Sequence, residues 1–523
     1  MPNSQVNSAL FMISSRVLCM IIGLAGLPIL LSGLGTEKFA SWAVLLGGSV
    51  AFYTLEMGMI GTVTKFIAEA FSRQENSRIS ELMSNAIILL FAIYSIGLVC
   101  VIALSGSVAT WMKIPDTPLL SGKNLLIFVY LMVAVSSIAR VGTAPFHAIS
   151  RFDLVAGISL FHAVFSNVAA WSVAWYCGRL DIVILTYWAC HALVLLAAKY
   201  WASRLVVWRF RPSTVNKKLQ WSLLSHGFHL QFSDFANFIN FQFDKMIIAG
   251  FSGLFEVAHY EIASRACMGL RSLCSSGLNT FLPRATTYTA KSVDIWPLYQ
   301  EMTKGTMWLI IFFILSPLAV SPLFLFAWVG QIGYHGRYVF MFLAAGIAVN
   351  ILVVPVSIFI QAMGRTSLEA VVSVCSIFMN VLFSLVLIRF WGKEGAAAGT
   401  GLAMILAGMM YMYFFHKVHR RSMADTMRYL FHYSWPLLFI CLIWLALGRA
   451  IEPLVIGSRW YMGPASVVLY VTLVLALFVF CIYTGRLGKV EYEMICRIPG
   501  LGAVAKRYLN RRLAPNTDNF LSI

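Results

Sequence analysis

The sequence predicts an all-helical protein that crosses a membrane about fourteen times, because its hydrophobic residues fall into runs of spanning length. Of the 523 residues, 60% are hydrophobic and 11% are charged, and the mean hydropathy is +0.80. A soluble domain has about half apolar and a quarter charged residues, so this chain has too little polar surface to cover itself in water. Lipid is the solvent that suits this composition.

The predicted spans follow from run length, since a helix needs about 20 apolar residues to cross the hydrocarbon core. We expect helices because lipid offers no partner for backbone N–H and C=O groups. The runs stand at 9–31, 39–71, 84–109, 123–148, 154–177, 180–203, 221–250, 255–283, 303–329, 337–361, 367–390, 395–416, 434–451 and 463–484. The second, seventh and eighth runs are the most polar.

An internal repeat predicts how these helices are grouped. The loop after the fourth run and the loop after the tenth share an Ala, an Arg and a Leu at a constant offset of 214, as Ala148/Ala362, Arg151/Arg365 and Leu154/Leu368. The same offset relates the start of the first helix to the start of the seventh. We therefore expect two six-helix bundles related by a parallel repeat, plus two extra C-terminal helices. Such halves commonly enclose a central site and rock about it, which gives alternating access.

These observations divide the chain into five predicted parts. They are a six-helix bundle at 1–203, a basic linker at 204–220, a second bundle at 221–416, a linker with helices 13 and 14 at 417–484, and a basic tail at 485–523. Lys and Arg gather in the loops on one side, and the formal net charge is +18. Because cytoplasmic loops carry the excess of Lys and Arg, we expect both termini in the cytoplasm.

Several function classes are disfavoured by the sequence. The basic residues sit in short loops between helices, so we expect no binding of nucleic acid. The ten Cys are scattered without a CxxC, and no GxxxxGK[ST] occurs, so we expect no metal and no direct use of ATP. No loop exceeds about twenty residues, which leaves no room for a soluble catalytic domain. The sequence therefore predicts a protein that is not an enzyme and uses no cofactor.

Charged residues inside the spans are functional candidates, because a charge in the bilayer is costly. Arg16, Arg140 and Arg271 have no acidic residue three or four positions away, and we expect them to make a central cavity cationic. Guanidinium groups bind phosphate oxygens bidentately, so such a cavity suits a phosphate. We add three further cations as candidates for substrate binding: Lys65, Lys245 and Arg265. Alternatives are snorkelling to lipid phosphates for Arg16 and Lys65, and a structural pair with Glu261 for Arg265.

The seventh run is the most polar helix. Helical spacing places Ser233, Asn237, Asn240 and Asp244 on one face, among many Phe residues. Asn237 and Asn240 could hydrogen-bond sugar hydroxyls; the alternative is bonding to neighbouring helices with Phe facing lipid. The candidate ion-coupling residues are three carboxylates in or near the cavity helices: Glu56, Asp234 and Asp244.

Three segments resemble Wzx-type polysaccharide flippases of the multidrug/oligosaccharidyl-lipid/polysaccharide exporter superfamily. They are TLEMGMIGTVTKFIAEAFSR at 54–73, FQFDKMIIAGFSGLFEVAHYEIASR at 241–265, and the loop QAMGRTSLEAV. The resemblance spans residues 1–416. It implies two six-helix bundles in a V, with helices 1, 2, 7 and 8 flanking the central cavity. Wzx flippases typically have twelve helices, so the two extra helices keep lipid II flippases, with fourteen, as an alternative.

The resemblance implies a flippase in the bacterial inner membrane that moves a polyprenyl-pyrophosphate-linked oligosaccharide, as in O-antigen or lipopolysaccharide synthesis, to the outer leaflet. Coupling to an ion gradient is part of this expectation. The expected partners are this glycan lipid, membrane lipids and polysaccharide polymerase or assembly proteins. The alternatives are a lipid II-type flippase, a multidrug/cation antiporter with an acidic cavity, and a membrane-embedded glycosyl transferase or polymerase. Enzymes of the last class usually carry a sizeable extracytoplasmic catalytic loop, and the sequence has no such loop.

Overall fold

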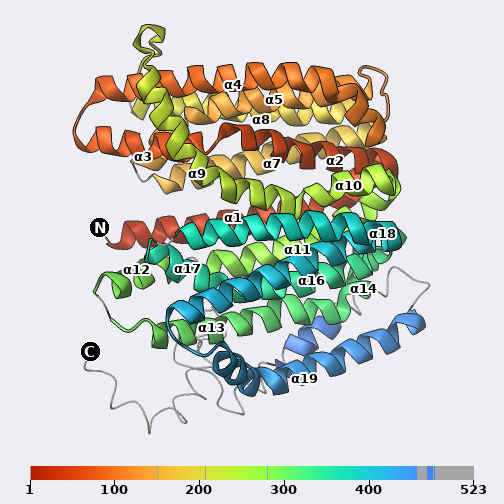
Figure 1. Cartoon of the computed structure of the whole chain (residues 1–523). Coiled ribbons are helices and arrows are strands. Elements are labelled where there is room, and N and C mark those ends of the chain that lie inside the picture. The colour runs from red at the N-terminus through yellow and green to blue at the C-terminus, as the bar shows by residue number, and fades with distance from the viewer. Residues whose placement is uncertain are drawn as a thin grey trace.

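The computed structural model is built of helices, with no strand in the part of the chain that it describes. It describes residues 2–149, 151–205, 208–278, 281–291, 293–364, 366–455, 468–474 and 476–477. Ten helices in these ranges are long and apolar enough to cross a membrane. The long helices run side by side with their axes in one general direction (Figure 1). The predicted all-helical, multi-pass fold is confirmed, whereas the fourteen spans and the repeat stay predictions.

The helices of the first half fill the upper part of Figure 1. In chain order they are α1 (Pro2–Leu34), α2 (Thr36–Tyr53), the 3-10 turn η1 (Thr54–Glu56), α3 (Met59–Ser72), α4 (Asn76–Trp111), α5 (Gly122–Val141), α6 (Ala144–Ala148), α7 (Phe152–Cys177) and α8 (Leu180–Leu205). Helix α1 packs along α7, and α4 packs along α5. A short turn, η2 (Pro212–Thr214), leads into the second half.

The second half starts in the upper part of Figure 1, beside the first half, and its later helices fill the lower part. Its helices are α9 (Lys217–Phe241), α10 (Phe243–Phe251), α11 (Leu254–Leu278), α12 (Leu282–Ala290), α13 (Trp296–Ile310), a π-helical turn (Ile311–Leu315), α14 (Ser316–Val329), α15 (Gln331–Tyr334), α16 (Arg337–Leu352), α17 (Val354–Ala362), α18 (Thr366–Val418) and α19 (Met423–Val455). Helix α18 contains the predicted eleventh and twelfth spans, which meet at Gly392 with φ 54°. Most of the predicted span 463–484 lies outside the described residues. The whole of the predicted tail, 485–523, also lies outside them.

Several of the predicted single helices are broken, and the breaks in the second and seventh runs adjoin candidate residues. The second run bends after η1, where Met57 and Gly58 have φ values of 48° and 62°. The seventh run breaks at Gln242, whose φ of −126° and ψ of −28° separate α9 from α10. The prediction of one continuous polar face from Ser233 to Asp244 is therefore wrong, because the break turns Asp244 away from the face of α9.

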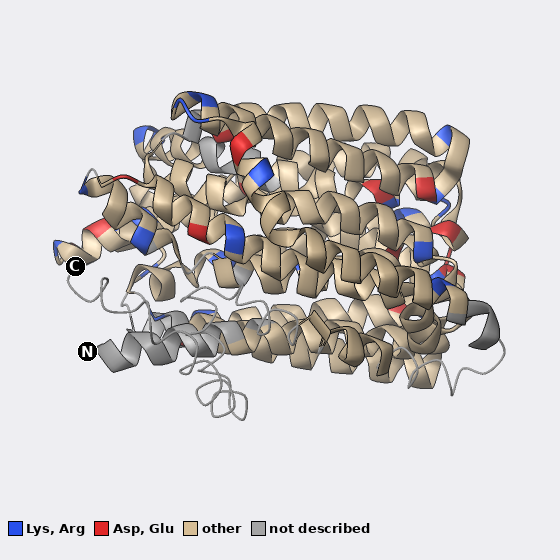
Figure 2. Ribbon diagram, turned by 90° about the horizontal axis from the view of Figure 1, so that it is seen from below, with Lys and Arg blue, Asp and Glu red and all other residues tan. Residues whose placement is uncertain are grey.

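Charged residues stand mainly toward the two ends of the helices, and a belt between them is nearly free of charge (Figure 2). Large apolar side chains are exposed within the bundle's helices, among them Phe91, Ile96, Trp175, Phe378 and Phe390. So many exposed apolar side chains of this size indicate a surface that contacts lipid or a partner. The structure thus supports a protein that spans the membrane, while the side on which each terminus lies stays a prediction.

The two halves meet along α1, α2 and α3 on one side and α9, α10 and α11 on the other. Glycines allow this close approach. A Cβ added to Gly47 on α2 would lie 3.3 Å from Oε1 of Gln242, and one added to Gly227 on α9 would lie 2.0 Å from the carbonyl oxygen of Met57. The bend of the second span therefore rests directly against the other half.

Candidate functional site: a charged cavity between the two halves

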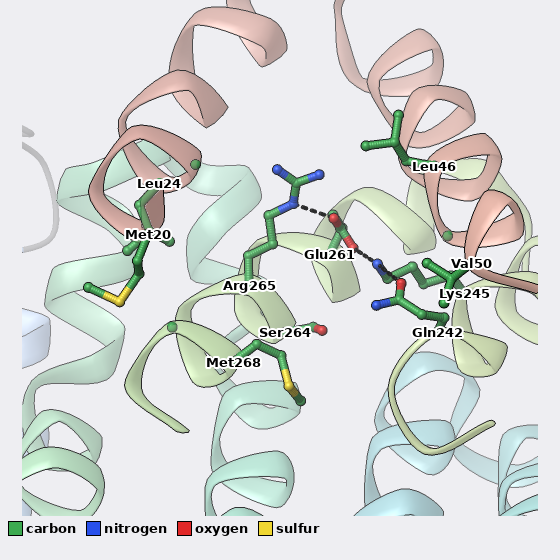
Figure 3. A pocket seen from close by; sticks show the side chains of 13 residues that line it. Met20, Leu24, Leu46, Val50, Gln242, Lys245, Glu261, Ser264, Arg265 and Met268 are labelled. Atoms are coloured by element: carbon green, nitrogen blue, oxygen red, sulfur yellow. Dashed lines mark hydrogen bonds and ion pairs between the residues drawn. The ribbon is translucent and has the colours of Figure 1, made fainter. Parts of the chain in front are cut away.

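A cavity of about 380 Å³ lies between the halves, and we call it the central cavity. Helices α1 and α2 line it from the first half, and the α9–α10 junction, α10 and α11 line it from the second. Figure 3 shows its lining side chains converging from these helices. The lining residues are Met20, Gly23, Leu24, Leu46, Gly47, Val50, Gln242, Lys245, Glu261, Ser264, Arg265, Met268 and Gly269.

Lys245, Glu261 and Arg265 form an ion-pair triad in this cavity. Nζ of Lys245 lies 2.6 Å from Oε2 of Glu261, and Nε of Arg265 donates to Oε1 of the same carboxylate. The exposed fractions of the three side chains are 7%, 1% and 25%, respectively. Glu261 and Arg265 are one turn apart on α11, as the sequence predicts for a structural pair. Lys245 reaches them because α10 starts anew after the break at Gln242.

The triad leaves one positive charge in excess, since two cations share one carboxylate. Figure 3 shows the terminal nitrogens of Arg265 directed away from Glu261, toward the space between the helices. Of the three guanidinium nitrogens of Arg265, Nε is the one that donates a hydrogen bond to another described residue. The terminal nitrogens thus remain available to an anion, and charge-assisted bonds from guanidinium to phosphate oxygen are among the strongest hydrogen bonds in proteins.

Asp244 sits beside the triad but faces the other way. Its Oδ2 accepts from the hydroxyls of Tyr260 and Thr400, each at 2.5 Å, and its Oδ1 accepts from Ser384 at 3.2 Å. The side chain is fully buried. Hydroxyls from α11 and from both arms of α18 thus converge on one carboxylate, which ties α10 to these helices.

Arg271, Asn237 and Asn240 lie in a second cavity of about 240 Å³ inside the second half, the C-terminal cavity. Nε of Arg271 donates to Oδ1 of Asn350 at 3.0 Å, and its guanidinium stacks 4.4 Å from the ring of Phe241. The candidate amides therefore line the same cavity as Arg271, and this cavity is distinct from the central one.

Arg140 lies in a third cavity of about 260 Å³ inside the first half, the N-terminal cavity. Its Nη1 is 3.2 Å from Oε1 of Glu56. The prediction that Arg140 is unpaired is therefore wrong, because the bend of the second span presents a carboxylate to α5. The expected convergence of Arg140 and Arg271 on one chamber is also wrong, since each faces the interior of its own half.

The remaining candidates lie elsewhere or outside the description. Lys65 is exposed on α3, with its Nζ 6.0 Å from the ring of Phe66, and lines none of these three cavities. The side chains of Arg16 and Asp234 lie outside the described residues. No pattern in the sequence indicates the contact between Lys245 and Glu261, because this contact depends on the break at Gln242.

The comparisons with known proteins agree with this architecture. A family model described as "Polysaccharide biosynthesis protein" matches residues 6–289. Comparison with curated protein sequences finds no match.

Solved structures of transporters share the fold. The lipid II flippase MurJ in an inward closed conformation is similar with a TM-score of 0.69 and 11% identity, over 91% of this chain and 99% of that one. An inward-facing multidrug resistance MATE family transporter of the MOP superfamily gives 0.60 and 14%, over 78% and 97%. The MATE transporter VcmN of Vibrio cholerae gives 0.57 and 11%, over 80% and 98%.

Proposed function

Because this chain belongs to the polysaccharide biosynthesis protein family, we propose that it is a flippase for a polyprenyl-pyrophosphate-linked oligosaccharide. The substrate would pass from the cytoplasmic to the outer leaflet of the bacterial inner membrane as the halves rock about the central cavity. Both termini would lie in the cytoplasm, where polysaccharide polymerase or assembly proteins are candidate partners. A carrier of O-antigen or lipopolysaccharide precursors is the corresponding biological role.

The excess positive charge of the central cavity is the observation on which this proposal rests. A pyrophosphate carries negative charge on oxygens that a guanidinium can bind bidentately, and Arg265 presents its terminal nitrogens to the cavity. Lys245 adds a second cation within the same triad. Anion binding would therefore begin at the triad.

The other walls of the cavity suit the rest of such a substrate. Met20 and Leu24 of α1 face Met268 and Gly269 of α11, and a Cβ added to Gly269 would lie 3.1 Å from Sδ of Met20. This apolar seam is where a polyprenyl chain would lie while its pyrophosphate stays at the triad. The sugar hydroxyls would reach amides such as Asn237 and Asn240 as the halves move.

Two carboxylates remain candidates for coupling to an ion gradient. Asp244 is held by three hydroxyls, and these oxygens together form the kind of ligand set that a hard cation takes. Glu56 is joined to Arg140 and could exchange that partner for a proton. We retain both as proposals, with Asp234 as the third.

A cation antiporter of the same fold is the competing proposal. Binding of a cationic drug favours a cavity with excess negative charge, whereas the triad has excess positive charge. A lipid II-type flippase is harder to distinguish from the proposed flippase. Lipid II and the proposed glycan lipid share the polyprenyl pyrophosphate, and lipid II differs in its sugars and peptide. Transport assays must therefore include all three cargo classes.

The test is transport in proteoliposomes containing the purified protein. We would follow the flipping of a fluorescent polyprenyl-pyrophosphate sugar, a fluorescent lipid II and a cationic dye. Loss of a charge-assisted hydrogen bond costs about 1.5–3 kcal/mol. Arg265→Gln should therefore weaken uptake of the glycan lipid by about tenfold to a hundredfold.

Arg78→Gln is the matched control, because Arg78 forms an exposed ion pair with Glu75 at the end of α4. It should transport like the wild type. Equal transport by Arg265→Gln and the wild type would contradict the proposed role of the triad. Pumping of the cationic dye without glycan transport would establish the antiporter instead.

A further inference from the structure

The N-terminal and C-terminal cavities occupy corresponding places in the two halves. Seven residues that line the first differ by 214 in number from residues that line the second, which is the offset of the sequence repeat. Examples are Thr143/Ser357, Ser159/Ser373 and His162/Ser376. The chemistry differs at the last pair, because a histidine in the first half stands where the second half has a serine.

We propose that the N-terminal cavity binds a proton at a pair of histidines, His162 and His191, and that this proton loosens the bend of the second span at Met57 and Gly58. The proposed function is needed only to give this proton a role in transport. Proton binding and its effect on the bend can be measured without a substrate.

The two imidazole rings are in direct contact. Nδ1 of His191 is hydrogen-bonded to Nε2 of His162, the ring centroids are 4.3 Å apart, and the Oη of Tyr53 lies 3.2 Å from Nε2 of His191. When both rings are neutral, they hold one hydrogen between them and one more, either on Nδ1 of His162 or on Nε2 of His191. Uptake of one proton fills both outer nitrogens, so His191 then donates to Tyr53 and the pair carries one positive charge.

A chain of contacts leads from this charge to the bend. The ring of Tyr53 lies 5.2 Å from the guanidinium of Arg140, whose Nη1 is 3.2 Å from the carboxylate of Glu56. Glu56 immediately precedes Met57, the first residue of the bend. A positive charge on the histidine pair repels Arg140 and competes with it for Glu56. Arg140 is 40% exposed, so it has room to withdraw.

The groups around the pair do not cancel its charge. Tyr187 on α8 has its ring 6.2 Å from that of His162, His147 on α6 lines the cavity, and Arg265 on α11 acts on Tyr187 electrostatically. Among the described residues, helix α3 contributes Ile60 to the lining, and none of the described lining residues is a carboxylate. Glu56 is therefore the acidic group on which the chain of contacts ends.

The bend also touches the second half. A Cβ added to Gly227 on α9 would lie 2.0 Å from the carbonyl oxygen of Met57 and 3.4 Å from Oγ1 of Thr62. Loosening the bend therefore acts on the surface along which the halves move. A proton in the first half would in this way bias the packing of α3 against α9.

The experiment is hydrogen–deuterium exchange of the full-length protein in detergent between about pH 4 and about pH 8. This range extends well below the ordinary histidine pKa of about 6.5, because the pair lies beside Arg140 with no carboxylate among the described lining residues. Rates in peptides covering residues 50–62 are divided by the intrinsic rate at each pH. We expect the corrected exchange of the wild type to be at least about fivefold faster at the acidic pH, because the opening free energy falls.

The double variant His162→Gln/His191→Gln should lose this pH dependence, and Tyr53→Phe should lose it with the histidines intact. His432→Gln, at an exposed position of α19, should keep it and is the matched control. A pH-independent wild type, or pH dependence retained in either the double variant or Tyr53→Phe, would overturn the proposal. If the double variant does not fold, Tyr53→Phe alone decides.

The outcome is separate from that of the flippase test. A protein that shows this exchange behaviour but flips no glycan lipid would refute the proposed function and leave the proton site standing. A protein that flips the lipid but shows no acid-dependent exchange would refute the proton site and leave the proposed function standing.

Discussion

Replacing Glu261 by Gln removes the carboxylate that Lys245 and Arg265 share in the central cavity. The amide has nearly the same shape, so packing changes little and the loss is electrostatic. Lys245 is then left 93% buried without its ion-pair partner, at a site where water cannot easily replace the carboxylate. The remaining two cations also repel each other across the cavity.

The size of the effect follows from burial. Removing one member of a buried ion pair costs about 3–5 kcal/mol, because the other charge stays desolvated. The same substitution at Glu75 breaks the pair with Arg78, in which the side chains are 38% and 47% exposed. Exposed pairs contribute about 0–1 kcal/mol. The two Glu→Gln variants should therefore differ by at least about 2 kcal/mol in the free energy of unfolding.

Unfolding of the purified protein in mixed micelles, titrated with a denaturing detergent, measures this difference. Adding Lys245→Met to Glu261→Gln should recover part of the lost stability, because the uncompensated cation is removed as well. Equal unfolding free energies for Glu261→Gln and Glu75→Gln would refute the inference that the triad is a buried, coupled unit. So would a double variant less stable than Glu261→Gln alone.

Other positions test the packing between helices. Gly227→Ala should lower the free energy of unfolding by about 1–3 kcal/mol, because its Cβ would meet the backbone of Met57 at 2.0 Å. Gly305→Ala, where a Cβ meets nothing within 4 Å, should instead stabilise helix α13 by up to about 1 kcal/mol, and equal melting temperatures for the two would contradict the close contact. Asp244→Asn should cost about 1–3 kcal/mol, since an amide nitrogen cannot accept from the surrounding hydroxyls, whereas Tyr260→Phe removes one bond and should cost about 1 kcal/mol. Thermal unfolding compares the last two, and a larger loss for Tyr260→Phe would argue against a hydroxyl-bound carboxylate.

The sequence also anticipated part of the site. Glu261 and Arg265 are one helical turn apart, and a charged pair at that spacing is expected to be in contact wherever the helix lies. Arg271, Asn237 and Asn240 lie in one cavity, but inside the second half and not in the chamber between the halves where Arg271 was expected. The functional roles assigned to these residues remain predictions for the transport assays.

The charges in the N-terminal cavity could not be paired from the sequence. Glu56 and Arg140 are 84 residues apart, and His162 and His191 are 29 apart. Contacts at such separations depend on which faces of two helices are turned toward each other. The sequence places each residue on its helix but does not fix the rotation of one helix against another.

The sequence by itself determined that the chain lies in lipid and that its spans are helices. Hydrophobic content and run length are properties of the chain alone, and in lipid only a hydrogen-bonded helix or a closed barrel satisfies the backbone. The tertiary structure alone decided where two of those helices bend, at Met57–Gly58 and at Gln242. These bends turned Glu56 toward Arg140 and Lys245 toward Glu261, because a change of a few backbone dihedral angles redirects every side chain that follows.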